Sequence, residues 1–124
     1  MGDARRSLGQ AAETAAATLL VRAGLRVVER NVRFALGEID LVCRDGDAWV
    51  FVEVKCRRTW WSDGPAAAVS WRKQDRLTRL ASLYLSRRRL GNPRCRFDIV
   101  AVAVDPAGRM TVEHLRDAFP ATRS

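Results

Sequence analysis

The sequence predicts an α/β (α+β) sandwich, in which helices flank a mixed central sheet. Amphipathic helical periodicity occurs in two separate stretches, and β-rich segments bounded by turn signals lie between and after them. The resulting order is helix, three strands, helix, two strands. Because 124 residues suffice for one hydrophobic core, we expect a single domain over residues 1–119, followed by a frayed tail at 120–124.

The first helix is predicted over residues 7–23, where apolar side chains recur at about 100° per residue. Its stripe consists of Leu8, Ala12, Ala15, Ala16, Leu19, Leu20 and Ala23. Gly24 suits the C′ position and would end this helix. Residues 25–30 then predict the first strand.

Two β-rich runs, residues 37–44 and 48–57, flank the turn signal Asp45-Gly46-Asp47 and predict an antiparallel hairpin. The loop length sets the register of Asp40 on one strand against Glu53 on the other. A two-residue Asp45-Gly46 turn, with Arg44 opposite Asp47, makes them diagonal neighbours, and a four-residue loop places them directly opposite. Only a three-residue loop would separate their faces.

A loop is predicted over residues 59–68, and Ser70 suits the N-cap of a second helix over 71–88. The apolar stripe of this helix contains Leu77, Leu80, Ala81 and Tyr84, and its other face is strongly basic. Residues 95–104 are so apolar that we expect a central strand covered on both faces. A shorter last strand is predicted over residues 110–116.

A net charge of +8 favours polyanionic partners, nucleic acid above all, although a basic surface without a specific role would have the same charge. Lysine occurs only at Lys55 and Lys73, and a compact ammonium is not interchangeable with a guanidinium. The three cysteines and the single His114 lack zinc-ligand spacing. No apolar run is long enough to span a membrane, so we expect a cytoplasmic protein.

The predicted hairpin contains the strongest candidates for chemistry. Strand alternation places Glu53 and Lys55 on one face, where a suitable register would bring Asp40 beside them. Two close carboxylates repel, and Mg²⁺ or Mn²⁺ would relieve that repulsion. Phosphodiester hydrolysis is the natural reaction for such a site. The alternative is a surface carboxylate–lysine pair without catalytic function.

Three further residues have two interpretations each. Glu13 borders the apolar stripe of the first helix and points either toward the sheet or to solvent. Lys73 lies on the inward stripe of the second helix, and either extends to the rim of the sheet or reaches phosphate or the carboxylates. Asp98 either pairs with an arginine inside the fold or adds a ligand to the site. The pair Trp60-Trp61 could stack on unpaired bases or serve as packing or dimer contacts.

Several motifs follow one another in a fixed order. They are Gly9-Gln10-Ala11-Ala12-Glu13, Arg30-Asn31, Gly37-Glu38-Ile39-Asp40-Leu41, Val50-Phe51-Val52-Glu53-Val54-Lys55, Lys73-Gln74 and Arg96-Phe97-Asp98. With them the chain closely resembles the bacterial YraN family over residues 9–104. That family is similar to the restriction-endonuclease-like PD-(D/E)xK superfamily, in particular its Holliday-junction resolvases.

This resemblance implies a restriction-endonuclease-like αβββαβ core with four catalytic positions, Glu13, Asp40, Glu53 and Lys55. Asp40, Glu53 and the carbonyl of Val54 would bind Mg²⁺ or Mn²⁺, Glu13 would complete the metal site, and Lys55 would assist the water. The function expected is a metal-dependent endonuclease-like protein acting on DNA, including branched or damaged DNA in recombination or repair. The nucleic-acid contacts expected are Arg57, Arg58, Arg72, Lys73, Gln74 and Arg76.

Two other functions fit the same sequence. One is a non-catalytic nucleic-acid-binding module that keeps the fold and the basic face. The other is an adaptor whose basic helix docks an acidic protein partner. Cutting a four-way junction would require a homodimer that presents two sites.

Overall fold

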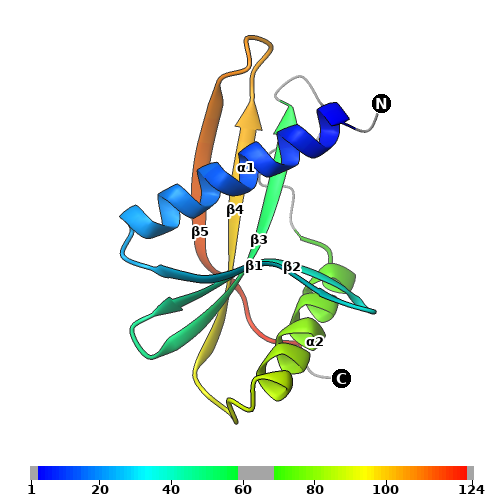
Figure 1. Ribbon diagram of the computed structural model, residues 1–124, viewed down its shortest axis with the longest axis vertical. Coiled ribbons are helices and arrows are strands. Elements are labelled where there is room, and N and C mark those ends of the chain that lie inside the picture. The colour runs from blue at the N-terminus through cyan, green and yellow to red at the C-terminus, as the bar shows by residue number, and fades with distance from the viewer. Residues whose placement is uncertain (1–2, 59–68, 123–124) are drawn as a thin grey trace.

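The computed structural model describes residues 3–58 and 69–122, with side chains from Ser7 onward, and this part is an α+β fold of two helices and a five-stranded sheet (Figure 1). The elements are α1 (Asp3–Arg22), β1 (Arg26–Phe34), β2 (Gly37–Asp45), β3 (Ala48–Arg58), α2 (Trp71–Arg87), β4 (Cys95–Val104) and β5 (Met110–Phe119). Their order and the fold class confirm the prediction. The pair Trp60-Trp61 lies outside the described residues.

The strands lie side by side in chain order, from β1 to β5. β3 and β4 run parallel, whereas the other neighbouring strands pair antiparallel, so the sheet is mixed as predicted. A parallel pair needs a long crossover, and α2 lies within the connection from β3 to β4. β4 is an interior strand, and its residues 97–102 are buried.

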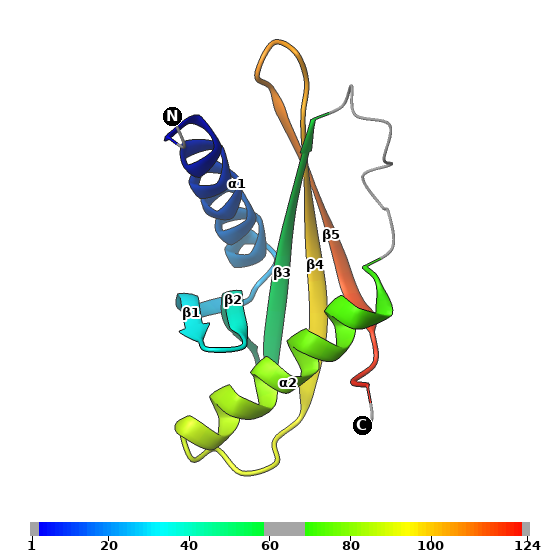
Figure 2. The same cartoon turned by 90° about the vertical axis from the view of Figure 1, so that its right-hand side faces the viewer.

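Two hydrophobic clusters cover the two faces of the sheet, and α1 and α2 belong to different clusters (Figure 2). On the α1 side, the helix contributes Ala12, Ala16 and Leu20. On the α2 side, it contributes Leu77, Leu80, Ala81 and Tyr84, which are the residues of the predicted stripe. The sheet between them is therefore a covered middle layer. Neither described helix has the length and apolarity that crossing a bilayer requires.

The two predicted helix caps, Gly24 and Ser70, are confirmed, whereas α1 begins at Asp3 rather than at residue 7. Gly24 has a φ of +98°, and its N–H donates to the Val21 carbonyl at 3.0 Å, while Leu25 N–H donates to the Leu20 carbonyl at 3.0 Å. This is a Schellman C-cap. Ser70 Oγ accepts a hydrogen bond from Lys73 N–H at 3.2 Å and caps α2. Ala23, which the sequence placed on the buried stripe, is exposed because α1 ends at Arg22.

Two strands are longer than their composition indicated. β1 continues to Phe34, since its polar residues pair with β2 through to the contact between Phe34 and Gly37. β5 continues to Phe119, which pairs with Phe97 after an irregularity in the ladder. In both cases pairing with a neighbouring strand outweighs the weak strand propensity of the residues. Beyond β5, Thr122 N–H donates to Thr78 Oγ1 on α2 at 3.2 Å.

Candidate active site

The register of the hairpin decides whether the predicted carboxylates meet. Leu41 pairs with Val52, and the ladder continues to Asp45 opposite Ala48, with Gly46-Asp47 as the turn. Extending this register by one position places Asp40 directly opposite Glu53. It is the register that a four-residue loop would also give.

Asp40 lies where β2 separates from β3. Its Oδ2 accepts a hydrogen bond from the backbone N–H of Val54 at 2.8 Å, in place of a strand-to-strand hydrogen bond. Burial raises the pKa of Asp40 to about 7, and the neighbouring carboxylate of Glu53 adds to that increase. The Val54 hydrogen bond acts in the opposite direction. Asp40 is thus a partly buried carboxyl that favours a proton or a cation at neutral pH.

Glu53 faces Asp40 from β3 and has cations on its other side. Burial raises the pKa of Glu53, while Lys73, Arg76 and Lys55 oppose the shift. Two of these cations come from α2 and one from β3. The carboxylate of Glu53 therefore has the repulsive carboxylate of Asp40 on one side and the attractive cations of α2 and β3 on the other.

Two further carboxylates join Asp40. Carboxylate oxygens of Glu13, Glu38 and Asp40 all lie within 4.8 Å of one another, so Glu13 points toward the sheet rather than to solvent. Burial raises the pKa of Glu13, and a hydrogen bond from the side chain of Asn31 opposes this increase. Glu38 also accepts a hydrogen bond from Arg33 Nε at 3.0 Å. Glu53 lies outside this group of three but acts on Asp40 electrostatically, and we call the four carboxylates Glu13, Glu38, Asp40 and Glu53 the acid cluster.

Sequence reasoning did not select Glu38. The signal was present, because Glu38 shares a strand face with Asp40 two positions earlier. What was missing was the position of α1, whose Glu13 reaches the same place from outside the hairpin.

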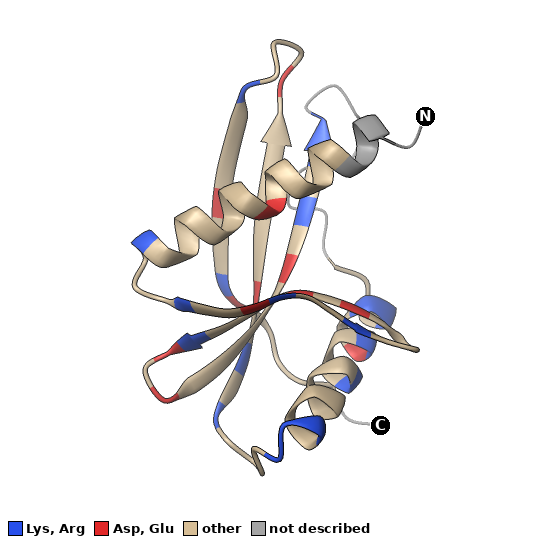
Figure 3. Cartoon of the chain, viewed as in Figure 1, with Lys and Arg blue, Asp and Glu red and all other residues tan. Residues whose placement is uncertain are grey.

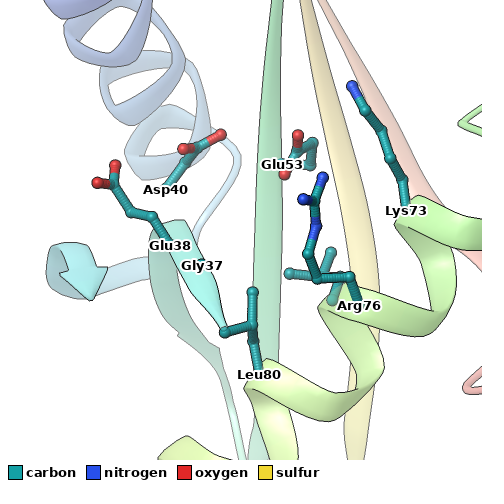
Figure 4. A pocket seen from close by; sticks show the side chains of 8 residues that line it. Gly37, Glu38, Asp40, Glu53, Lys73, Arg76 and Leu80 are labelled. Atoms are coloured by element: carbon teal, nitrogen blue, oxygen red, sulfur yellow. The ribbon is translucent and has the colours of Figure 1, made fainter. Parts of the chain in front are cut away.

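A cavity of about 200 Å³ lies between the acid cluster and α2. It is lined by Gly37, Glu38, Asp40, Glu53, Lys73, Arg76, Leu77 and Leu80. Figure 4 shows Asp40 and Glu53 on neighbouring strands, with Lys73 and Arg76 approaching from α2. Lys73 is exposed rather than packed inward, and it lines the cavity that contains Glu53. Of its two interpretations, the structure has the one in which it faces the carboxylates.

The other predicted site residues lie around this centre. Lys55 is half-buried on β3, two residues beyond Glu53, and Arg57 and Arg58 follow near the end of that strand. Arg72 is exposed on the first turn of α2. Gln74 does not line the cavity; its side-chain amide donates to the Val69 carbonyl at 2.8 Å. Figure 3 shows the basic residues of α2 across from the acidic residues of α1, β2 and β3.

Asp98 is not part of the site. It is fully buried, and Arg96 Nε donates to its Oδ1 at 3.0 Å. Its other oxygen lies 2.7 Å from His114 Nε2, and Asp117 N–H donates to Oδ1 at 3.0 Å. The expectation that Asp98 pairs with an arginine is confirmed.

A family model described as "Uncharacterised protein family UPF0102" matches residues 12–102 of the chain. The chain belongs to this family. UPF0102 is the YraN family, so the resemblance stated from the motifs is confirmed. The matched span of this UPF0102 protein contains the whole acid cluster together with Lys55, Lys73 and Arg76.

UPF0102 proteins from several bacteria are similar to this chain over nearly their whole length. A UPF0102 protein from Symbiobacterium thermophilum is 50% identical over 116 residues, which cover 94% of this chain and 98% of that protein. One from Streptomyces griseus is 49% identical, and the alignment covers 92% of this chain and 97% of that protein. One from Xanthomonas euvesicatoria is 47% identical, with 98% of each chain covered.

Proposed function

We propose that this protein is a metal-dependent, endonuclease-like phosphodiesterase of the cytoplasm that binds nucleic acid, with DNA as its substrate. The observation that carries the proposal is the arrangement in the cavity. Asp40 and Glu53 lie on neighbouring strands, while Lys73 and Arg76 approach from α2. Adjacent acidic and basic groups suit a site that holds a cation and a phosphate together.

The donor set fits a hard divalent cation. Mg²⁺ and Mn²⁺ prefer oxygen ligands, and Glu13, Glu38 and Asp40 offer carboxylates within 4.8 Å of one another whose mutual repulsion a cation would relieve. Asp40, Glu53 and the Val54 carbonyl would hold the ion, and Glu13 would complete the site. A bound divalent ion would supply positive charge to a phosphate oxygen and a more acidic water.

The cations of the chain have separate tasks in this proposal. Lys73 and Arg76 would bind the non-bridging phosphate oxygens, because both line the cavity opposite the carboxylates. Lys55, on the strand of Glu53, would orient the attacking water or offset charge that develops on the phosphoryl group. Arg57 and Arg58 follow Lys55 on β3, and Arg72 precedes Lys73 on α2, so these three would contact phosphates along the nucleic-acid strand.

The decisive experiment measures cleavage of labelled branched, single-stranded and duplex DNA with Mg²⁺ or Mn²⁺. Wild type is compared with Asp40→Asn and Lys55→Ala. Asp47→Asn is the matched control, because Asp47 is an exposed carboxylate in the hairpin turn. We expect metal-dependent cutting by wild type and the control, and a loss of at least a hundredfold in the other two variants.

A different result would favour the non-catalytic alternative. If no protein cuts any substrate, but all bind DNA with an affinity that falls as salt rises, the basic residues alone account for the function. If none binds DNA while an acidic protein is bound through α2, the adaptor would be the better description.

A further inference from the structure

A second cavity lies on the other side of the acid cluster, between α1 and β1. Its volume is about 430 Å³, and it is lined by Gly9, Gln10, Glu13, Asn31 and Arg33. Glu13 belongs both to this cavity and to the acid cluster, so the two are adjacent. The larger cavity falls in the range of about 300–1,000 Å³ that is typical of pockets for small organic groups. The smaller cavity beside α2 falls below that range.

Of the residues that line the second cavity, Gly9 is a locally unfavourable choice and Asn31 has a left-handed backbone conformation. Gly9 lies inside α1, where glycine is less favourable than alanine. Packing does not require it, because an added Cβ at Gly9 would meet no atom within 4 Å. Asn31 has a φ of +54°, a left-handed conformation that asparagine adopts more readily than most residues other than glycine. The absence of a side chain at Gly9 leaves room for a ligand, and the side-chain amide of Asn31 supplies a polar group in the cavity.

The polar groups of this cavity suit a nucleotide. Gln10 is exposed on α1 and offers an amide that both donates and accepts hydrogen bonds, as the edge of a nucleobase does. Arg33 supplies a cation, and its Nε lies 3.0 Å from a carboxylate oxygen of Glu38 in the acid cluster. Asn31 bonds to Glu13 and joins the wall of the cavity to the proposed catalytic centre.

We propose that the cavity between α1 and β1 binds one unpaired nucleotide next to the phosphate that is cut. This inference rests on the proposed function, and it names the class of substrate. A base within a duplex is stacked and paired, so it must be extruded before it can enter a pocket. The substrate is therefore a single strand, or a duplex with an unpaired nucleotide at the cutting site.

The test uses variants that fill or strip the cavity. Gly9→Leu places a side chain in the open space and also improves helix propensity, so it blocks the cavity without weakening α1. Gln10→Ala removes the amide. Thr18→Ala is the matched control, because Thr18 is exposed on α1 and does not line the cavity. Affinity is measured by fluorescence anisotropy in EDTA, with a short single-stranded oligodeoxynucleotide, its ribonucleotide counterpart and a blunt duplex.

We expect Gly9→Leu to weaken single-strand binding about tenfold or more, and Gln10→Ala about threefold to tenfold. Duplex affinity should be unchanged in both variants, and the thermal midpoint of Gly9→Leu should not fall. Thr18→Ala should match wild type. A loss of affinity in Gly9→Leu for the oligodeoxynucleotide identifies a deoxyribose sugar in the bound nucleotide, and a loss for its ribonucleotide counterpart identifies a ribose.

Unchanged single-strand affinity in Gly9→Leu would overturn the inference, as would an equal loss for the duplex. The proposed function fails in a different way. If the wild type never cuts but Gly9→Leu selectively loses single-strand binding, the nucleotide site stands and the nuclease does not. If the wild type cuts and Gly9→Leu cuts a single strand equally well, the nuclease stands and the nucleotide site does not.

Discussion

Asp40 and Asp98 are both carboxylates inside this fold, and their surroundings are opposite. Asp98 is fully buried and has Arg96, His114 and the Asp117 N–H as partners. Asp40 accepts a hydrogen bond from Val54, but the charges that act on it are those of Glu53, Glu13 and Glu38. A charge that the fold itself satisfies contributes to structure, whereas a repulsive cluster is stable only with a proton or a cation.

The largest effect is expected from removing Asp98, the carboxylate that has partners inside the fold. Asp98→Ala removes both hydrogen bonds from Arg96 to Asp98 and leaves the Arg96 guanidinium, whose side chain is only 13% exposed, with Asp45 as its remaining partner among the described residues. Removing one member of a buried ion pair is expected to lower the free energy of unfolding by about 3–5 kcal/mol. Urea denaturation measures it, with Asp47→Ala as an exposed control expected to stay within about 0.5 kcal/mol. A loss below about 1 kcal/mol would mean that the buried network is dispensable.

The second prediction concerns a metal ion at Asp40, whose charged neighbours are other carboxylates. Mn²⁺ or Mg²⁺ at 100 times its dissociation constant should stabilise the wild type by about 2.7 kcal/mol, because only the folded chain brings the carboxylates together. Asp40→Asn should lose most of this stabilisation, and Asp47→Asn should retain it. Thermal unfolding with and without EDTA gives the comparison. An equal metal effect in both variants would place the ion elsewhere.

The third prediction is a pH dependence in EDTA. The pKa of Asp40 is raised from 3.8 to about 7, so the folded chain keeps a proton that the unfolded chain releases near pH 4. Stability must therefore fall as pH rises from about 4 to 7, by on the order of 1 kcal/mol for this partly exposed group. Asp40→Asn should remove that part of the slope. The measurement is the unfolding midpoint at pH 5 and pH 8, and identical slopes in the two proteins would contradict it.

The smallest expected effect comes from Glu38→Gln. The substitution lowers the repulsion on Asp40 and weakens an exposed ion pair with Arg33, so the free energy of unfolding should change by no more than about 0.5 kcal/mol. Metal affinity, measured by isothermal titration calorimetry, should fall only a few-fold. A loss as large as that of Asp40→Asn would make Glu38 an equal partner in holding the ion.

Local rules were enough to predict much of the fold. Gly24 and Ser70 act within a few residues of the helix ends that they cap, and strand alternation placed Glu53 and Lys55 on one face. These features depend on neighbours in the sequence, so the sequence alone contains them. The same reasoning left two acceptable registers for Asp40, because the turn residues fit more than one loop length.

Features that depend on distant segments could not be predicted. Glu38 joins the acid cluster only because Glu13 of α1 reaches the same place. No pattern in the sequence predicts where α1 lies relative to the hairpin. The partners of Asp98 come from β4 and β5, so their meeting depends on how the strands pair. The length of β1 likewise follows from its pairing with β2.

The parallel pairing of β3 and β4 places a condition on when the site can exist. The carboxylates of β2 and β3 belong to a hairpin whose contacts are close in sequence, so they can meet early in folding. Lys73 and Arg76 lie on the crossover that leads to β4, and they reach the same cavity only when that long-range connection has closed. In the proposed enzyme, an incompletely folded chain would have the acids without the phosphate-binding cations. Folding itself would then act as the switch that keeps a nascent nuclease inactive.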